Sequence, residues 1–345
     1  MTGDMMDLKA LIAKAANGTP LSEDEARLAV DIMMSGDATP AQMGGFLMSL
    51  RTRGETVPEI TGAAKAMRDK MVTVNAPADA IDTCGTGGDG VGTYNISTAT
   101  AFVAAGCGVP VAKHGNRAMS SKSGAADVLK ALGVNIEADT PLVERCLREA
   151  RTCFLLAPRY HSAMRHVGPA RAELGTRTLF NLLGPLSNPA KVRRQVLGVF
   201  SSDWVEPLAH VLNNLGHTRA WVVHGADGLD ELSTTGASKV AEVRDGTVTS
   251  FEVVPEDAGL CRAHLTDLKG GDAERNAHAI KALLDGEHGP FRDIVVFAAA
   301  AAMVVADRAG DLHEGVAMAT ESIDAGHARA ALEAMIAITH DRTPM

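Results

Sequence analysis

The sequence predicts an α/β protein in which a small helical N-terminal domain precedes a large domain with a mostly parallel central sheet flanked by helices. Three observations support this prediction. The first seventy residues read as consecutive short helices, with no strand-like alternation between them. From about residue 79, short apolar segments of strand length alternate with segments of helical length. The composition, 46% hydrophobic but only 3% aromatic, also favours helices and α/β layers over a β-sandwich.

The helices of the N-terminal domain are marked by residues that start and stop helices. Ser22 and Glu25 form a capping-box pattern, and Gly36 is placed to end that helix. Thr39, which a proline follows, is the expected N-cap of the next helix. A further helix is expected to begin at Val57.

The large domain is predicted from five apolar strands and the helices between them. The expected strands cover residues 80–83, 109–112, 153–157, 195–200 and 219–223. The expected helices cover residues 97–106, 123–132, 141–150, 204–215 and, in the helical tail after residue 272, 294–306. Two Val-rich runs within residues 239–254 flank Asp245-Gly246, which predicts a β-hairpin.

The domain boundaries follow from these patterns. Residues 1–72 are expected to form the helical domain and residues 73–345 the α/β domain. The segment 168–190 breaks the alternation of strands and helices, so we expect it to return to the helical domain. Two domains joined in this way would form a cleft between them, which is a common place for a binding site.

Composition restricts the class of partner and the compartment. The net charge of −9 argues against nucleic acid as the main partner, because such proteins usually carry a basic face. The five cysteines include no Cys-x-x-Cys pair, which predicts free thiols in a reducing compartment. No signal-peptide pattern is present, and the longest apolar run is shorter than the roughly 20 residues of a membrane helix. We therefore expect a cytoplasmic protein with no membrane partner.

The most informative stretch of the sequence combines three features that suit phosphate. A glycine-rich loop, residues 85–90, follows a predicted strand, a helix start rich in hydroxyls covers residues 95–98, and a basic loop covers residues 113–117. Glycines let backbone N–H groups approach phosphate oxygens, and a helix N-terminus and cationic side chains add positive charge. The spacing fits neither the dinucleotide fingerprint nor a P-loop, and the loop alone is more typical of a tight turn on a sheet edge. Together, the three features predict a site for a ligand that carries several phosphates.

Two further groups suit a metal ion and a carboxylate. Asp230 and Glu231 follow a predicted strand and could hold Mg²⁺ through a few oxygens, the alternative being an exposed acidic turn. Arg171 and Arg177 could clamp a planar carboxylate in bidentate fashion, the alternative being surface charge on a helix. No Ser-His-Asp or Cys-His arrangement predicts a covalent nucleophile, and no general base is evident, so no catalytic residue is assigned.

Taken together, the motifs resemble those of the anthranilate phosphoribosyltransferases. The resemblance runs in order from the first helices to about residue 335. It rests on residues 82–90 and 95–98, Lys113-His114-Gly115-Asn116-Arg117, residues 121–124, Asn181-Leu182-Leu183-Gly184-Pro185-Leu186 and Asp230-Glu231-Leu232. The segments 113–117 and 181–186 are more specific to this family than the glycine loop is, because related folds share that loop.

The resemblance implies a homodimer with a fold like that of nucleoside phosphorylases and phosphoribosyltransferases, and a Mg²⁺ cofactor. It implies transfer of phosphoribose from 5-phosphoribosyl 1-pyrophosphate to the amino group of anthranilate, which gives N-(5-phosphoribosyl)anthranilate and pyrophosphate in tryptophan biosynthesis. Two rival hypotheses stay open: a nucleoside phosphorylase of the same superfamily, against which the paired acids argue, and a non-catalytic nucleic-acid-binding relative, against which the net charge argues.

The resemblance also implies which residues bind each ligand. The phosphoribosyl donor would contact Gly85, Gly88, Asp89, Thr93, Asn95, Ile96, Ser97, Thr98, Lys113, His114, Gly115, Asn116, Arg117, Ala118, Met119, Ser120, Ser121 and Ala125. Anthranilate would lie near Gly85, Asn116 and Arg171, and Mg²⁺ would bind Ser97, Asp230 and Glu231. Two residues depart from the pattern: Ala125 replaces a frequent serine, and Ala298 stands where asparagine is expected. Neither removes an expected metal or carboxylate contact.

Overall fold

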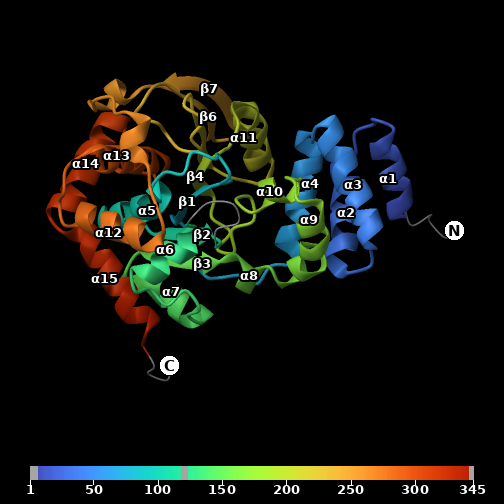
Figure 1. Ribbon diagram of the computed structural model, residues 1–345, viewed down its shortest axis with the longest axis horizontal. Coiled ribbons are helices and arrows are strands. Elements are labelled where there is room, and N and C mark those ends of the chain that lie inside the picture. The colour runs from blue at the N-terminus through green and yellow to red at the C-terminus, as the bar shows by residue number, and fades with distance from the viewer. Residues whose placement is uncertain (1–6, 118–122, 342–345) are drawn as a thin grey trace. The chain divides into compact units, whose positions relative to one another are not determined.

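The computed structural model describes residues 7–117 and 123–341 (Figure 1). The chain divides into two compact units. Unit 1 combines Met1–Thr73 with Pro158–Pro189, and unit 2 combines Val74–Ala157 with Ala190–Met345. The first 73 residues therefore share a unit with a segment that lies more than eighty residues further along the chain.

The described residues of unit 1 form helices joined by loops, with no strand among them. Its elements are α1 (Leu8–Ala16), α2 (Glu23–Ser35), α3 (Pro40–Arg53), α4 (Val57–Asp69), the 3₁₀ helix η1 (Ser162–His166), α9 (Gly168–Leu174) and α10 (Phe180–Leu183). The short helix α8 (Ala157–Tyr160) spans the point where the chain passes from unit 2 to unit 1.

Local chemistry explains where these helices begin and end. The predicted capping box is present at α2, where Ser22 Oγ accepts from Glu25 N at 3.2 Å and Glu25 Oε2 accepts from Ser22 N at 2.7 Å. Gly36 ends this helix in the left-handed region, with φ 86°. Thr39 caps α3, as predicted, and α4 begins at Val57.

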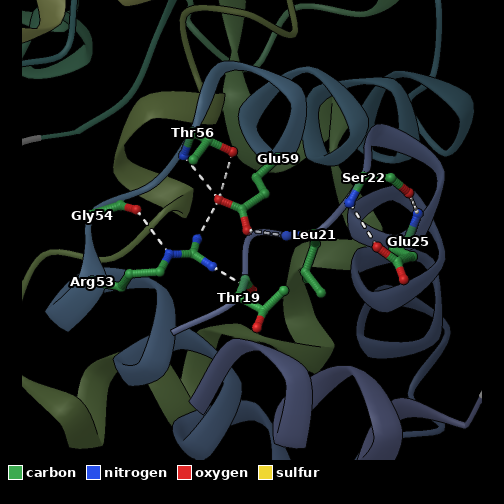
Figure 2. Close-up of polar contacts among 8 residues, drawn as sticks. All are labelled: Thr19, Leu21, Ser22, Glu25, Arg53, Gly54, Thr56 and Glu59. Atoms are coloured by element: carbon green, nitrogen blue, oxygen red, sulfur yellow. Dashed lines mark hydrogen bonds and ion pairs between the residues drawn. The ribbon is translucent and has the colours of Figure 1, made fainter. Parts of the chain in front are cut away.

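A buried carboxylate joins three segments of unit 1 (Figure 2). Glu59, in the first turn of α4, is fully buried. It accepts hydrogen bonds from Leu21 N at 2.8 Å, Thr56 N at 2.9 Å and Thr56 Oγ1 at 2.8 Å, and forms an ion pair with Arg53. Arg53 also donates to the carbonyl of Thr19 at 2.9 Å. The chain before α2, the end of α3 and the start of α4 are thereby tied to one side chain.

Unit 2 is built on a seven-stranded sheet with the order β3-β2-β1-β4-β5-β6-β7. The strands are β1 (Ile81–Gly85), β2 (Val111–Gly115), β3 (Thr152–Leu156), β4 (Arg194–Gly198), β5 (Arg219–Gly225), β6 (Ser238–Arg244) and β7 (Thr247–Val253). The first five pair in parallel, and β5, β6 and β7 pair antiparallel. The predicted hairpin is confirmed, because Asp245 and Gly246 join β6 to β7 with φ of 48° and 86°.

Helices cover the sheet of unit 2 (Figure 1). They are α5 (Ile96–Gly106), α6 (Ala125–Ala131), α7 (Thr140–Glu149), α11 (Val205–Asn214), α12 (Ala273–Leu284), α13 (Pro290–Val305), α14 (Leu312–Asp324) and α15 (His327–Thr339), with the 3₁₀ helices η2 (Ser202–Trp204), η3 (Pro255–Ala258) and η4 (Leu265–Leu268). The buried, Ala-rich α13, which contains Ala298, packs on α5 and α14. None of the helices in the described residues has the length and apolarity that crossing a bilayer requires.

One predicted boundary is wrong. The second strand is expected to end at residue 112, with Lys113 and His114 in a loop, yet β2 continues to Gly115 and both side chains are buried. A buried lysine is costly unless it is hydrogen-bonded and faces opposite charge. The charge of Lys113 therefore favours a loop when only the sequence is considered. The partners that make its burial possible lie on other elements of unit 2.

Candidate active site

The carboxyl ends of the central strands meet beside Asp230. Gly85 ends β1 and Gly198 ends β4, and these two strands pair residue for residue. A Cβ atom at Gly85 would collide with the Asp230 carboxylate, and one at Gly198 with its backbone carbonyl. Both strand ends therefore need glycine, because the segment after β5 lies directly against them. In open α/β sheets, ligands bind at this edge, where neighbouring connections leave the sheet in opposite directions.

The turn that carries Asp230 and Glu231 is held by another aspartate. Asp227 Oδ2 accepts from Ser233 Oγ at 2.6 Å and from Thr235 Oγ1 at 2.7 Å. Apolar side chains on both sides of the acidic pair, Leu229 and Leu232, are buried. The hydrogen bonds of Asp227 and the two buried leucines therefore fix the turn, and the two acidic side chains lie at the ends of the strands.

The acidic pair accepts hydrogen bonds from the glycine loop and from the first turn of α5. Gly87 N, in the glycine loop, donates to Asp230 Oδ2 at 2.8 Å. Ser97 N, in the first turn of α5, donates to Glu231 Oε1 at 3.1 Å. Burial raises the pKa of Asp230 to about 6, with Asp89 adding to the effect, and burial raises the pKa of Glu231 to about 8, with Asp230 adding to it. Negative charge at this edge is therefore poorly solvated and in excess.

These features fit a magnesium ion that is shared with a ligand. Among residues 7–117 and 123–341, no three His, Cys, Asp or Glu side chains are grouped so that they could hold a metal by themselves. Mg²⁺ commonly takes one or two carboxylates and completes its octahedron with water and phosphate oxygens. A divalent cation would also relieve the excess negative charge that raises the two pKa values. Asp230 and Glu231, with the Ser97 hydroxyl near them, would supply the protein oxygens.

Lys113 brings a positive charge to the same place. Its side chain, only 3% exposed, donates from Nζ to the carbonyl of Thr83 at 2.5 Å and to Ser97 Oγ at 3.1 Å. Ser97 thus receives the lysine on its hydroxyl and offers its backbone N–H to Glu231. A cation, the Glu231 carboxylate and the positive end of the α5 dipole converge on one serine.

A strap from the C-terminal half of the chain, residues 268–271, holds the segment just after the glycine loop. Tyr94 N donates to Leu268 O at 3.1 Å, and Gly270 N donates to Gly92 O at 3.1 Å. Thr93, a predicted donor contact, forms a bridge with Lys269. These bonds leave residues 85–90 between two fixed ends, the strand β1 on one side and the strap on the other.

Asn276 extends this strap to the N-cap of α5. It is only 1% exposed, and its Nδ2 donates to Asn95 Oδ1 at 2.9 Å while its Oδ1 accepts from Gly271 N at 2.8 Å. In the first turn of α5, Thr98 Oγ1 is buried without a hydrogen-bond partner among the described residues. Sequence reasoning missed Asn276, because 181 residues separate it from Asn95 and its neighbours read only as an ordinary helix start.

The remaining residues of the basic segment lie at the surface or outside the described residues. Asn116 and Arg117 are exposed, and Arg117 forms an exposed ion pair with Glu137 at 3.2 Å. Ala125 is the first residue of α6. Four of the residues assigned to the donor, Ala118, Met119, Ser120 and Ser121, lie outside the described residues.

Arg171 belongs to unit 1, on α9. Its guanidinium is half-buried, lies 5.5 Å from the centre of the Phe180 ring and donates weakly to Asn181 Oδ1 at 3.5 Å. Among the described residues no carboxylate forms an ion pair with it, and burial lowers its pKa. A stacked guanidinium of this kind is suited to a planar carboxylate from a ligand.

The structure therefore brings several of the predicted phosphate and metal residues together. Gly85, Ser97, Lys113, Asp230 and Glu231 form one connected group at the sheet edge of unit 2. Gly88 and Asp89 lie in the adjoining loop. The predicted anthranilate residues are divided between units, with Arg171 in unit 1 and the other two in unit 2.

Two known protein families match this chain. The family described as "Glycosyl transferase family, helical bundle domain" matches residues 9–71. The family described as "Glycosyl transferase family, a/b domain" matches residues 77–329. The second match alone covers more than half of the chain.

Three similar proteins share a name. The chain is 64% identical over 338 residues to an anthranilate phosphoribosyltransferase of Azospirillum brasilense, covering 98% of this chain and 95% of that protein. A solved structure of the enzyme of that name from Thermus thermophilus is 46% identical, with a TM-score of 0.91 and coverage of 96% and 99%. The Saccharomyces cerevisiae enzyme in complex with PRPP and Mg is 30% identical, with a TM-score of 0.88 and coverage of 96% and 97%.

Proposed function

Since the chain belongs to the anthranilate phosphoribosyltransferases, within the glycosyl transferase family, we propose that it transfers phosphoribose from 5-phosphoribosyl 1-pyrophosphate to the amino group of anthranilate. The products are N-(5-phosphoribosyl)anthranilate and pyrophosphate. The observation that carries this proposal is the convergence of Lys113, Glu231 and the start of α5 on Ser97, beside Asp230. A relative from yeast has been solved with PRPP and Mg, and another structure of it holds 4-fluoroanthranilate.

The donor's diphosphate would lie at the carboxyl edge of the sheet. The N–H groups of the glycine loop and of the first turn of α5, together with the Lys113 ammonium, would donate to its oxygens. Asp230, Glu231 and Ser97 would hold Mg²⁺ there. When bound, Mg²⁺ neutralises the charge that develops on the departing pyrophosphate.

The reaction breaks the bond between C1 of the ribose and the pyrophosphate oxygen, and forms a bond between C1 and the anthranilate nitrogen. The pyrophosphate leaves with the electron pair, and the amine loses one proton. Aromatic amines are weak nucleophiles, so positioning is expected to contribute more than deprotonation. Arg171 would bind the anthranilate carboxylate, and Asn116 and Gly85 would lie near its ring.

The proposal is tested by following anthranilate fluorescence with the full chain. We expect the fluorescence to fall only when both phosphoribosyl pyrophosphate and Mg²⁺ are present. Omission of Mg²⁺, or addition of a chelator, is the matched control. Folded protein that consumes no anthranilate under these conditions would disprove the proposed activity.

Replacement of Arg171 by alanine is expected to raise the KM for anthranilate by about 10- to 100-fold, because a charged hydrogen bond contributes about 1.5–3 kcal/mol. The KM for the donor should stay within about twofold. Arg171→Lys keeps the charge but loses the planar fork of the guanidinium. Its KM for anthranilate should lie between those of the wild type and Arg171→Ala.

Arg165→Ala is the control for this variant, because Arg165 is an exposed arginine of the same unit on η1. Steady-state kinetics with each substrate varied in turn separate the two effects. An equal rise of the KM for both substrates would show that Arg171 does not bind anthranilate specifically.

We also propose that the protein forms a homodimer and lies in the cytoplasm. The resemblance to this family supports a homodimer. The five cysteines are all free, and four of them are at least partly buried, which supports a reducing compartment such as the cytoplasm.

A further inference from the structure

The asparagine at the start of α5 does not cap its own helix. Asn95 occupies the N-cap position, where an asparagine side chain normally accepts a hydrogen bond from a backbone N–H of the first turn. Among the described residues its side chain receives no such bond. Ser97 N donates to Glu231 Oε1 at 3.1 Å instead. Thr98 N donates to the backbone carbonyl of Asn95 at 3.2 Å. The Asn95 side chain is therefore available to a partner outside its helix.

That partner is Asn276, the fourth residue of α12. Its Nδ2 donates to Asn95 Oδ1 at 2.9 Å, and its Oδ1 accepts from Gly271 N at 2.8 Å. Gly271 belongs to the strap, residues 268–271, which is itself bonded to the backbone of residues 92–94. Asn276 is buried, so its amide is held between a fixed strap and the start of α5.

The two hydrogen bonds of Asn276 fix which atom of each amide faces the other. A backbone N–H can only donate, so the Asn276 atom that faces Gly271 N is the oxygen. Asn276 therefore presents its N–H₂ group to Asn95, which presents its own oxygen in turn. The N–H₂ group of Asn95 is left over, and it donates to none of the residues 7–117 and 123–341.

We propose that Asn276 is a positioning residue, which turns the amide of Asn95 so that Asn95 Nδ2 donates to a phosphate oxygen of the phosphoribosyl donor. This inference rests on the proposed function. Asn95 is half-buried and lies two residues before Ser97, the serine that receives the lysine and carboxylate contacts of the candidate site. Phosphate oxygens only accept, so an amide that offered its oxygen would repel them. Asn276 excludes that orientation.

Asn276→Asp and Asn276→Ala separate this role from that of a structural tie. Aspartate keeps an oxygen for Gly271 N but offers a second oxygen to Asn95, so the Asn95 amide should reverse and turn its own oxygen toward the donor. Alanine only removes the contact that fixes the amide. We expect the KM for the donor to rise at least about tenfold in Asn276→Asp and by less in Asn276→Ala. The KM for anthranilate should change less than about twofold in both.

A purely structural tie predicts the opposite order. Only alanine leaves Gly271 N without its acceptor, so a residue that merely held the strap would tolerate aspartate better than alanine. Thermal melts of the two variants report this structural contribution separately. The order of the two donor constants therefore distinguishes positioning of Asn95 from support of the strap.

The negative charge of the new aspartate is a second cause of weaker binding, and the Asn95→Ala background separates it. Without the Asn95 amide, Asn276→Asp should change donor affinity less than about twofold, whereas direct repulsion by the charge would persist. Calorimetry with phosphoribosyl pyrophosphate and Mg²⁺ measures this affinity, so the cycle does not depend on turnover.

Asn135→Asp is the matched control. Asn135 also joins two segments of unit 2, because its Oδ1 accepts from Glu137 N at 3.1 Å and its Nδ2 donates to the carbonyl of Thr339 at 3.0 Å. It contacts none of the residues of the candidate site described above. Its replacement should leave donor affinity unchanged.

Each outcome decides the matter. Wild-type donor affinity in Asn276→Asp, an equal loss in both Asn95 backgrounds, or a larger loss in Asn276→Ala would overturn the proposal. If Asn276→Asp does not fold, the same cycle with Asn276→Ala decides: a loss that vanishes in the Asn95→Ala background supports the proposal, and an absent or persistent loss overturns it. If neither variant folds, Asn276 serves the fold and the proposal is wrong. A wild-type chain that binds no donor would disprove the proposed function itself, whereas the cycle addresses Asn276 alone.

Discussion

Replacing Asp230 and Glu231 together by asparagine and glutamine should lower turnover by about a thousandfold or more, because metal-assisted stabilisation of the leaving group would be lost. The amides keep an oxygen for Gly87 N and Ser97 N, the backbone donors that the acids now satisfy. The geometry of the turn is therefore retained while its charge is removed. Steady-state turnover at saturating Mg²⁺ measures the effect.

The same change should leave thermal stability nearly intact. Burial raises the pKa of both acids, to about 6 and about 8, so their ionised forms are disfavoured in the folded protein. Removing such charges does not remove a stabilising interaction of the metal-free protein. Glu256→Gln, at an exposed pair with Arg262, is the control for loss of an acid elsewhere. Unchanged turnover in the double variant would show that Asp230 and Glu231 do not bind the metal and form only an acidic turn.

The second large effect is expected on stability, at Glu59. Glu59→Gln should destabilise the helical unit by about 3–5 kcal/mol, because it leaves Arg53 without its partner and turns an amide N–H₂ toward donors. The carboxylate accepts from Leu21, Thr56 and Arg53, and it is fully buried (Figure 2). A thermal melt that follows helical circular dichroism measures the loss.

A surface ion pair of the same unit gives the control for Glu59. Arg27 and Asp69 pair on exposed side chains, so Asp69→Asn should shift the melting temperature little. A wild-type melting temperature in Glu59→Gln would show that the contacts of this carboxylate in Figure 2 do not stabilise the unit.

The local features of the fold could be predicted because their causes lie within a few residues. The capping box of Ser22 and Glu25 and the left-handed Gly36 follow from adjacent side chains. The hairpin at Asp245-Gly246 follows from backbone preferences at two positions. Positions of the five parallel strands were predicted to within a few residues, since apolar runs between helices mark them.

The contacts of the candidate site could be predicted only in part. The glycine loop and the acidic pair are recognisable as residue types, but their meeting through Gly87 and Asp230 joins positions 143 residues apart. Asn276 carries no such signal, and Asp82 stands out only as the first residue of the segment 82–90. A buried asparagine at a helix start and a buried aspartate in a strand find their hydrogen-bond partners on other elements.

By itself, the sequence determined the succession of elements, the kind of chemistry and the family, because these depend on local pattern and on the order of motifs. Only the tertiary structure decided that β2 extends through Lys113 and that Asn276 bonds to Asn95. The physical reason is burial. A charge that reads as a loop residue in the sequence is stable within a sheet once hydrogen bonds and an opposite charge from distant segments surround it.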